Sequence, residues 1–231
     1  MGTIGAQFLP ENFDDCIASV RAAEEASYSH AWFIDSQILW QDCFVYMTHA
    51  LAQTRRITVG TAVTNPYTRH VTTTASAFAT LADRHPGRLT LGIGRGDSSV
   101  RTMGLDPVPT AFLAESVPIL RDLMAGRHVT INGADVHLRW ITEDPAIPIM
   151  MPATGPRNLR LAGSLADRVM LYVGINEESL RWALGHVRAG AEQAGRDPDS
   201  VAVSVLTAMW VSTMFVATVV PCRRWVTSPS A

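Results

Sequence analysis

A short glycine-rich run ends in a carboxylate, in the segment Gly92-Ile-Gly-Arg-Gly-Asp97 that continues an apolar stretch. Glycines at the end of a strand let a ligand or another backbone approach closely. A half-buried Asp97 at that place could act as a general acid. Alternatively, Asp97 caps the following turn beside Ser98 and Ser99, and the residues alone leave both interpretations open. Because the run lacks a Walker lysine, it is a weak phosphate-loop signal.

A second run, Ala153-Thr-Gly-Pro156, precedes a segment with helical spacing. Proline is favoured at the first helical position, and the free N–H groups of a helix start bind anions. Arg157 could add positive charge, although an ordinary strand–helix connection would use the same residues. This run therefore predicts either an anion site or a simple connection.

Asp35 ends the apolar stretch 31–34, where a carboxylate is costly unless it is used chemically or paired. The structural alternative to a catalytic role is an ion pair with an arginine. Trp40 could form the wall of a flat ligand site or simply pack in the core. The seven histidines show no metal-ligand spacing, and the GxSxG and HExxH motifs are absent.

The composition excludes several classes of function. All 19 basic residues are arginine, so chemistry that needs a lysine is excluded. With 21 acidic residues the net charge is −2, which does not indicate a positively charged surface for binding nucleic acid. Cys16, Cys43 and Cys222 lie far apart, which supports neither a disulfide framework nor a zinc site and favours a reducing, cytoplasmic location. No signal peptide is expected at the N-terminus. The uncharged stretch 201–220 is expected to hold a buried strand and its continuation rather than a membrane helix.

The elements that must position these residues alternate between two periods. Strands are expected at 3–9, 31–34, 57–63, 88–93, 146–151, 168–173 and 201–211. Helices are expected at 11–27, 42–53, 72–83, 110–125, 157–165 and 177–194. A hairpin around Asn132-Gly133 is expected within 128–140.

This alternation predicts an α/β fold with a parallel sheet covered by helices. A closed TIM (β/α)₈-type barrel is favoured over an open doubly wound sheet, since no GxGxxG follows the first strand. The 231 residues are expected to form a single domain that is barrel-like over 1–210, with an atypical tail at 211–231. The barrel is therefore expected to be incomplete at its C-terminus, with about seven strands and open edges; a tail that closes it in its own way is the alternative. In such barrels the site lies at the C-terminal ends of the strands.

The sequence resembles the luciferase-like flavin- or deazaflavin-dependent oxidoreductases, and most closely their F420-dependent branch. The matching stretches are 22–26, 32–35, 56–70, 87–97 and 152–156. The resemblance implies a barrel that binds a flat flavin or deazaflavin in its mouth, beside a non-proline cis peptide bond near Ala62-Val63. It also implies that the cofactor phosphate lies by Thr154, Gly155 and Pro156.

Two sets of site residues follow. The catalytic candidates are Asp97, as the proton handler, and Asp35. The candidates for cofactor binding are Trp40, Ala62, Val63, Thr64, Asn65, Gly94, Ala153, Thr154, Gly155, Pro156, Val173 and Gly174. Ser36 stands where the F420-dependent sugar-phosphate dehydrogenases carry a catalytic histidine, which argues against a sugar-phosphate substrate.

The function implied by the resemblance is hydride transfer between coenzyme F420 and a small organic substrate. The alternatives are an FMN-dependent luciferase-like monooxygenase or reductase, and a shortened relative that binds the cofactor without turnover. The expected partners are a small-molecule substrate and a second copy in a homodimer, with neither nucleic acid nor a membrane. No metal site is expected.

Overall fold

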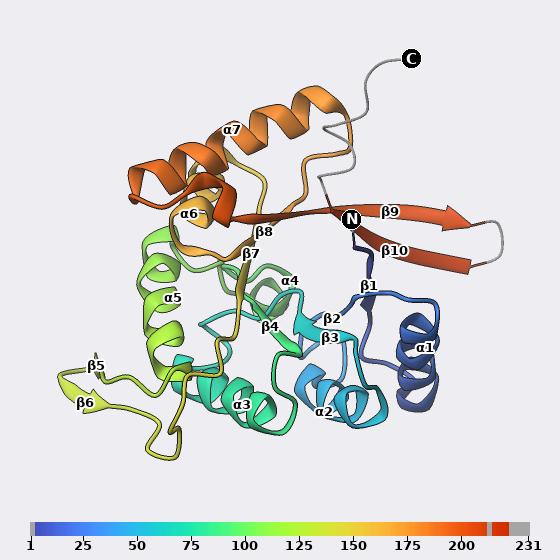
Figure 1. Ribbon diagram of the computed structural model, residues 1–231, viewed down its shortest axis with the longest axis horizontal. Coiled ribbons are helices and arrows are strands. Elements are labelled where there is room, and N and C mark those ends of the chain that lie inside the picture. The colour runs from blue at the N-terminus through green and yellow to red at the C-terminus, as the bar shows by residue number, and fades with distance from the viewer. Residues whose placement is uncertain (1–2, 212–213, 222–231) are drawn as a thin grey trace.

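The computed structural model describes the backbone of residues 3–211 and 214–221 and the side chains of residues 3–207. Its central feature is a closed ring of hydrogen-bonded strands in the order β1-β10-β9-β8-β7-β4-β3-β2 (Figure 1). Helices cover the outside of this ring. The predicted α/β barrel is therefore confirmed.

Seven strands of the ring pair in parallel, each with the strand that comes before or after it in the ring's chain order. The inserted hairpin takes no part in this pairing. The seven strands are β1 (Gly5–Phe8), β2 (His30–Phe33), β3 (Thr58–Thr61), β4 (Leu89–Gly92), β7 (Ile149–Ala153), β8 (Arg168–Leu171) and β9 (Ala202–Val211). Each lies within or next to a stretch expected from the sequence. Parallel pairing brings the C-terminal ends of these strands to one edge of the ring, where the predicted site residues follow them.

The eighth strand of the ring, β10 (Met214–Pro221), corrects an expectation. It pairs antiparallel with β9 along its whole length and with β1 through two residue pairs, so it occupies the edges that were expected to be open. The segment is rich in β-branched residues, which favour strands, but it lacks the two-residue alternation that marks a half-exposed strand. The remaining tail, residues 222–231, lies outside the described part of the chain, together with Cys222.

Six helices surround the ring at the predicted places. They are α1 (Phe13–Glu25), α2 (Cys43–Gln53), α3 (Val71–Arg84), α5 (Thr110–Met124), α6 (Pro156–Leu165) and α7 (Glu177–Gln193). Two short elements accompany them, α4 (Ser98–Arg101) and the 3₁₀ turn η1 (Pro198–Ser200). In the part of the chain that is described, no helix is both long enough and apolar enough to cross a bilayer.

The predicted hairpin is present as β5 (Val129–Ile131) and β6 (Ala134–Val136), which pair with each other apart from the ring. Asn132 and Gly133 both have positive φ angles, of 51° and 78°, as a tight two-residue hairpin turn requires. Figure 1 shows that this hairpin projects away from the barrel beside α5.

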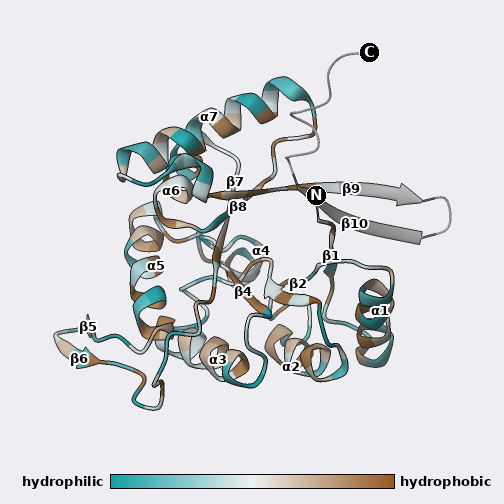
Figure 2. Cartoon of the chain, in the orientation of Figure 1, coloured by the Kyte–Doolittle hydropathy of each residue, from teal (hydrophilic) through white to brown (hydrophobic). Residues whose placement is uncertain are grey.

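The core has two parts. Most buried apolar side chains lie between the strands and the helices, among them Phe33, Tyr46 and Phe78. A smaller cluster of Trp32, Met150 and Met170, contacted by Ala62, Val63 and Leu206, fills the inside of the ring. Figure 2 shows the corresponding hydrophobic strands and the mixed surfaces of the helices around them. The inner cluster shares four of its residues with the lining of the cavity described next.

Candidate functional site

A cavity of about 530 Å³ opens at the edge of the ring where the parallel strands end. Seven of the residues expected in the site line it: Asp35, Ala62, Val63, Gly94, Asp97, Ala153 and Thr154. They come from the ends of β2, β3, β4 and β7 and the loops that follow. The rule that barrel sites lie at the C-terminal ends of the strands therefore places these residues together.

The peptide bond between Ala62 and Val63 is cis, as the resemblance implied. Both residues line the cavity, next to the glycine-rich loop after β4. A Cβ atom added to Gly94 would lie 3.0 Å from Val63 Cγ2 and 3.2 Å from Pro152 Cγ. The absence of a side chain at Gly94 therefore keeps this part of the cavity open.

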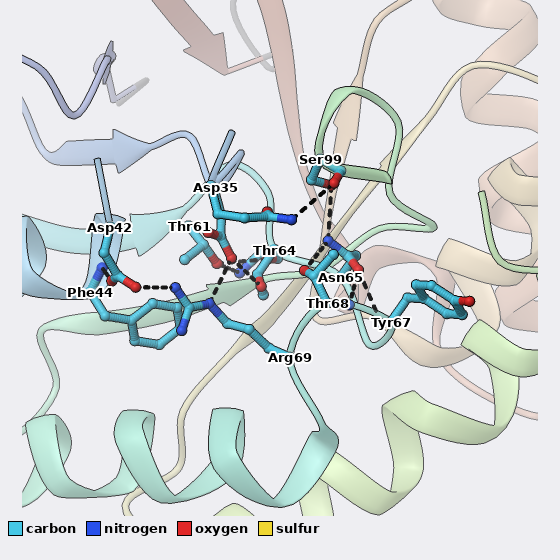
Figure 3. A network of polar contacts seen from close by, with 12 residues as sticks. Asp35, Asp42, Phe44, Thr61, Thr64, Asn65, Tyr67, Thr68, Arg69 and Ser99 are labelled. Atoms are coloured by element: carbon cyan, nitrogen blue, oxygen red, sulfur yellow. Dashed lines mark hydrogen bonds and ion pairs between the residues drawn. The ribbon is translucent and has the colours of Figure 1, made fainter. Parts of the chain in front are cut away.

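Thr64 and Asn65 stand behind the cavity wall rather than in it. Both are fully buried, and Thr64 Oγ1 donates a hydrogen bond to Asp35 Oδ2 at 2.6 Å. Asn65 Nδ2 donates to Thr68 Oγ1 at 2.9 Å and to Ser99 Oγ at 3.0 Å, which ties the loop after β3 to α4 (Figure 3). Their observed contacts position the loops on either side of the cavity.

Asp35 is the centre of a polar network at the end of β2. Its side chain is 2% exposed, and its Oδ2 accepts a charged hydrogen bond from Arg69 Nε at 3.1 Å. Arg69 also binds Asp42, the residue that caps the start of α2, and lies 4.3 Å from the centre of the Phe44 ring (Figure 3). The structure thus contains the ion pair that was the alternative to a catalytic Asp35.

This network also sets the electrostatics around Asp35. Burial acts to raise the pKa of Asp42, but the hydrogen bond and charge of Arg69 and the backbone N–H of Phe44 outweigh it, so the pKa falls below its usual value. Burial, and then the charge of Asp35, raise the pKa of the Cys43 thiol well above its ordinary value. Cys43 therefore remains a protonated thiol and is no candidate nucleophile.

Asp97 lies at the cavity, but in a different environment from the one expected. Its side chain is 82% exposed rather than half-buried, and its Oδ1 accepts a hydrogen bond from Arg101 Nε at 2.5 Å. Its side chain makes no capping hydrogen bond to the start of α4, so the capping alternative is also wrong. Gly96, the residue before it, has a φ of +80°.

The start of α6 lies next to the main cavity. A smaller cavity of about 380 Å³ is lined there by Gly155, Pro156, Arg157, Asn158 and Arg95. Pro156 occupies the first turn, and the cap residue Gly155 offers no side chain to the free N–H groups. A Cβ added to Gly155 would meet no atom within 4 Å, so open space lies in front of this helix start. The predicted anion site is thus geometrically available.

Besides Thr64 and Asn65, three residues expected in the site do not line these cavities. Trp40 is half-buried in the loop before α2, where its backbone N–H donates to Ser36 O at 2.9 Å. Val173 packs against the main core, and Gly174 is exposed with φ at +82°. The chain turns away after β8, which carries both residues off the cavity.

Several cavity residues were not expected from the sequence. Gln7, Arg95, Met170, Tyr172 and Leu206 all line the cavity, and Gln7 Nε2 donates to Ala62 O at 3.1 Å. Met170 and Tyr172 are two residues apart, as the period of a strand requires for side chains on one face. This spacing was a usable signal, but nothing in a continuously apolar strand says which face points inward.

Within the described residues, no group of three or more histidine, cysteine or acidic side chains is arranged to hold a metal ion. Cys16 and Cys43 are free and buried.

A family model described as luciferase-like monooxygenase matches residues 2–213, and the chain therefore belongs to this family. It is 32% identical over 208 residues to 5,10-methylenetetrahydromethanopterin reductase of Methanolobus tindarius, covering 87% of this chain and 63% of that protein. It is 33% identical over 218 residues to F420-dependent hydroxymycolic acid dehydrogenase of Mycobacterium tuberculosis, covering 86% of this chain and 60% of that protein.

The fold is also similar to that of a solved structure. The coenzyme F420-dependent tetrahydromethanopterin reductase from Methanopyrus kandleri superimposes with a TM-score of 0.75 at 26% identity, covering 89% of this chain and 65% of that one. The chain thus spans a little under two thirds of the length of these relatives.

Proposed function

We propose that this chain is an F420-dependent oxidoreductase, which transfers a hydride between the deazaflavin and a small organic substrate. The observation that carries the proposal is the pairing of the strand-end cavity with an uncapped helix start beside it. The names of the relatives support the choice of F420, because two of those given above are called F420-dependent.

The residues present fit such a cofactor. A flat ring system needs apolar walls, and Ala62, Val63, Met170 and Leu206 supply them within the cavity. A phosphate needs N–H donors and positive charge, and the first turn of α6 offers both beside Arg95 and Arg157. The two cavities share Arg95 and Asn158 in their linings, so they lie next to each other.

When bound, the deazaflavin would supply the hydride chemistry at its ring. The chain's own residues do the rest. Ala62 and Val63 form the wall on one side, and the network of Asp35, Thr64 and Arg69 holds the ends of β2 and β3 in place behind it. These buried contacts fix the wall, which is a positioning role rather than a chemical one.

We assign proton transfer to Asp97. Its Oδ1 is held by Arg101, which leaves Oδ2 to take a proton from the substrate oxygen or to return one. Asp97 is the lining carboxylate that is most exposed to an entering substrate, whereas Asp35 is buried and paired.

The substrate is proposed to be small and organic, and not a sugar phosphate. Ser36 is 1% exposed and does not line the cavity. Its Oγ finds no hydrogen-bond partner among the described residues, so it offers no proton-transfer group to a substrate.

A cofactor titration tests the proposal. We expect F420 to bind the purified chain and to raise its melting temperature, because a ligand that binds only the folded state stabilises it by mass action. FMN should produce a smaller shift. Oxidation of reduced F420 with small ketones, such as acetone, as acceptors then tests turnover. A shift with FMN alone would replace the proposal by a flavin-dependent one, and F420 binding without turnover with any acceptor would reduce it to cofactor binding.

We further propose that the chain forms a single domain, assembles as a homodimer through its outer helices and works in the reducing environment of the cytoplasm. The free, buried Cys16 and Cys43 are compatible with that environment. Light scattering coupled to size-exclusion chromatography measures the oligomeric state, and a mass of one 25.1 kDa chain would contradict the dimer.

A further inference from the structure

Polar side chains lie inside the ring at its N-terminal end, below the cluster formed by Trp32, Met150 and Met170. His30 lies two residues before Trp32 on β2, and it is the first residue of that strand. Arg168 lies two residues before Met170 and is the first residue of β8. Because side chains two residues apart on a strand share a face, His30 and Arg168 also point into the ring. They occupy the opposite end of the strands from the cofactor cavity, and neither lines it.

Arg168 carries a positive charge that no carboxylate neutralises. Its Nη1 donates a hydrogen bond to Ser204 Oγ on β9 at 3.0 Å. Burial lowers the pKa of Arg168 below its ordinary value, and no carboxylate charge opposes that shift. Residues 1–2 and 208–231, whose side chains are not described, include no aspartate or glutamate, so they cannot supply such a partner either. A partly buried cation without a counter-ion is costly in free energy.

The Trp32 indole supplies a second donor without a partner. Its side chain is 1% exposed, and its Nε1–H donates to no acceptor among the described residues. The indole nitrogen lies over β1, where a Cβ atom added to Gly5 would come within 2.8 Å of it. A buried N–H group in this state has lost its hydrogen bond to water and gained none in return. It is therefore ready to donate to an acceptor that is not part of the chain.

His30 connects these two donors. Its imidazole stacks on the Trp32 indole, with ring centroids 5.2 Å apart and an angle of 9° between the ring planes. Burial, and then the charge of Arg168, lower the pKa of His30 to about 4. The guanidinium is thus close enough to act on a ring that is stacked against the indole. At neutral pH His30 is uncharged, and Arg168 carries the positive charge of this layer.

We propose that the N-terminal end of the ring binds one small monovalent anion of the size of chloride, held by the Arg168 guanidinium and the Trp32 Nε1–H. The anion gives the guanidinium a counter-ion and the indole N–H an acceptor, so one ligand satisfies both groups. A single positive charge balances a single negative one, and the close packing of the indole on Gly5 leaves little room for a larger group. His30 and Arg168 are both partly exposed, so a small ion can enter from this end.

The dependence of stability on chloride tests the proposal. Sodium chloride is compared with sodium gluconate at equal concentration, because gluconate has the same charge but is much larger. A ligand that binds only the folded state stabilises it by mass action. Chloride at ten times its dissociation constant should therefore raise the folding equilibrium constant about elevenfold relative to gluconate. Chemical unfolding monitored by circular dichroism measures this ratio.

Two substitutions remove the proposed contacts one at a time. Arg168→Met removes the guanidinium and keeps an unbranched side chain, and it should abolish the chloride effect. Trp32→Phe removes the N–H and keeps an aromatic ring, and it should reduce the effect. Arg181→Gln is the matched control, because Arg181 is an exposed arginine on α7 that pairs with Glu177 outside the ring, and it should keep the full effect. Added F420 should leave the chloride effect unchanged, since the two sites lie at opposite ends of the strands.

Three results would contradict the proposal. They are equal stability of the wild-type protein in the two salts, an unchanged chloride effect in either folded variant, and loss of the effect when F420 is added, which would place the anion in the cofactor site. None of them depends on turnover, so the proposed function is tested separately.

A direct measurement covers the case in which Arg168→Met does not fold. Crystals of the wild-type protein grown in sodium bromide should show an anomalous scattering peak within hydrogen-bond distance of Trp32 Nε1 and the Arg168 guanidinium. Bromide found only at other places, or at none, would overturn the proposal.

Discussion

Arg69 Nε lies 3.1 Å from Asp35 Oδ2, and this ion pair joins the loop after β2 to the loop after β3. The same guanidinium binds Asp42 at the start of α2 at 2.5 Å, so one side chain fixes three segments of the chain. The first of these segments carries Asp35, which lines the proposed cofactor cavity. The position of the cavity wall therefore depends on an arginine that does not itself line the cavity.

Replacing Arg69 with glutamine should destabilise the protein substantially. The substitution leaves the buried Asp35 carboxylate without its charged partner, and breaking a mostly buried pair in this way costs about 3 kcal/mol. Chemical unfolding monitored by circular dichroism measures the change in free energy. The control is Arg181→Gln, which removes an exposed pair with Glu177 and should cost less than about 1 kcal/mol.

A double-mutant cycle distinguishes the pair from its surroundings. Asp35→Asn combined with Arg69→Gln should be less destabilised than the sum of the two single variants, because the two groups no longer leave each other unpaired. Strict additivity would show that the two side chains act independently, in contradiction to the observed contact.

Gly94→Ala should weaken cofactor binding with little loss of stability. The new methyl group would approach Val63 and Pro152 to 3.0 and 3.2 Å, so the cavity wall must shift by a few tenths of an ångström. We expect an affinity loss of about tenfold, or 1.4 kcal/mol. Gly185→Ala on α7 is the control, since its methyl group meets open space. Similar affinities for the two variants would place the cofactor elsewhere.

Glu24 should make the stability depend on pH. Its carboxylate accepts backbone hydrogen bonds from Arg55, Arg56 and Ile57 at 2.7 to 3.1 Å. Burial acts to raise its pKa, but these bonds and the charge of Arg88 outweigh it, so the pKa lies below the ordinary value of 4.5. The deprotonated carboxylate therefore stabilises the fold above about pH 4.5, and this contribution is lost as the pH falls through the lower pKa of the folded state.

The corresponding variant is Glu24→Gln. At pH 7 we expect it to be less stable than wild type by about 1 to 2 kcal/mol, and the difference should shrink on acidification. The neighbouring exposed Glu25→Gln is the control and should show no such trend. A difference that stays constant between pH 7 and the acid limit would assign the loss to packing instead.

Asp97→Asn should separate chemistry from binding. The side chain is exposed at the cavity, so its replacement leaves the fold and the affinity for F420 unchanged. If Asp97 handles the proton, the rate of oxidation of reduced F420 by a small ketone falls about a hundredfold or more. Glu25→Gln again serves as the exposed control. Full activity in Asp97→Asn would reassign proton transfer, and Tyr172, which also lines the cavity, would be the next residue to replace.

The sequence predicted the elements well because their signals are local. Apolar strands and amphipathic helices alternate in short segments, and the barrel rule then brings the strand ends together, which placed Asp35, Gly94 and Thr154 at one cavity. The exposure of Asp97 and the turn of the chain after Tyr172 could not be predicted in this way. They depend on how the loops pack, for which a sequence pattern carries no period.

Tertiary pairing was the other limit of prediction. Arg69 is 34 residues from Asp35, and no local sequence pattern around either residue indicates that the two form a pair. Gln7 was missed because the strand around it is too short to show which face points into the ring. The closing strand β10 was missed because its pairing with β1 joins the two ends of the described chain.

The glycine contacts between α6 and α7 have a kinetic consequence. Gly163 and Gly190 allow the backbones of α6 and α7 to approach closely. The helix pair is therefore rigid, and we expect it to keep its arrangement when a ligand binds. Binding of an anion at the start of α6, as proposed above, should then be a single encounter whose rate is set by long-range attraction rather than by an opening motion. Its association rate constant should therefore fall with added salt and show no plateau at high ligand concentration.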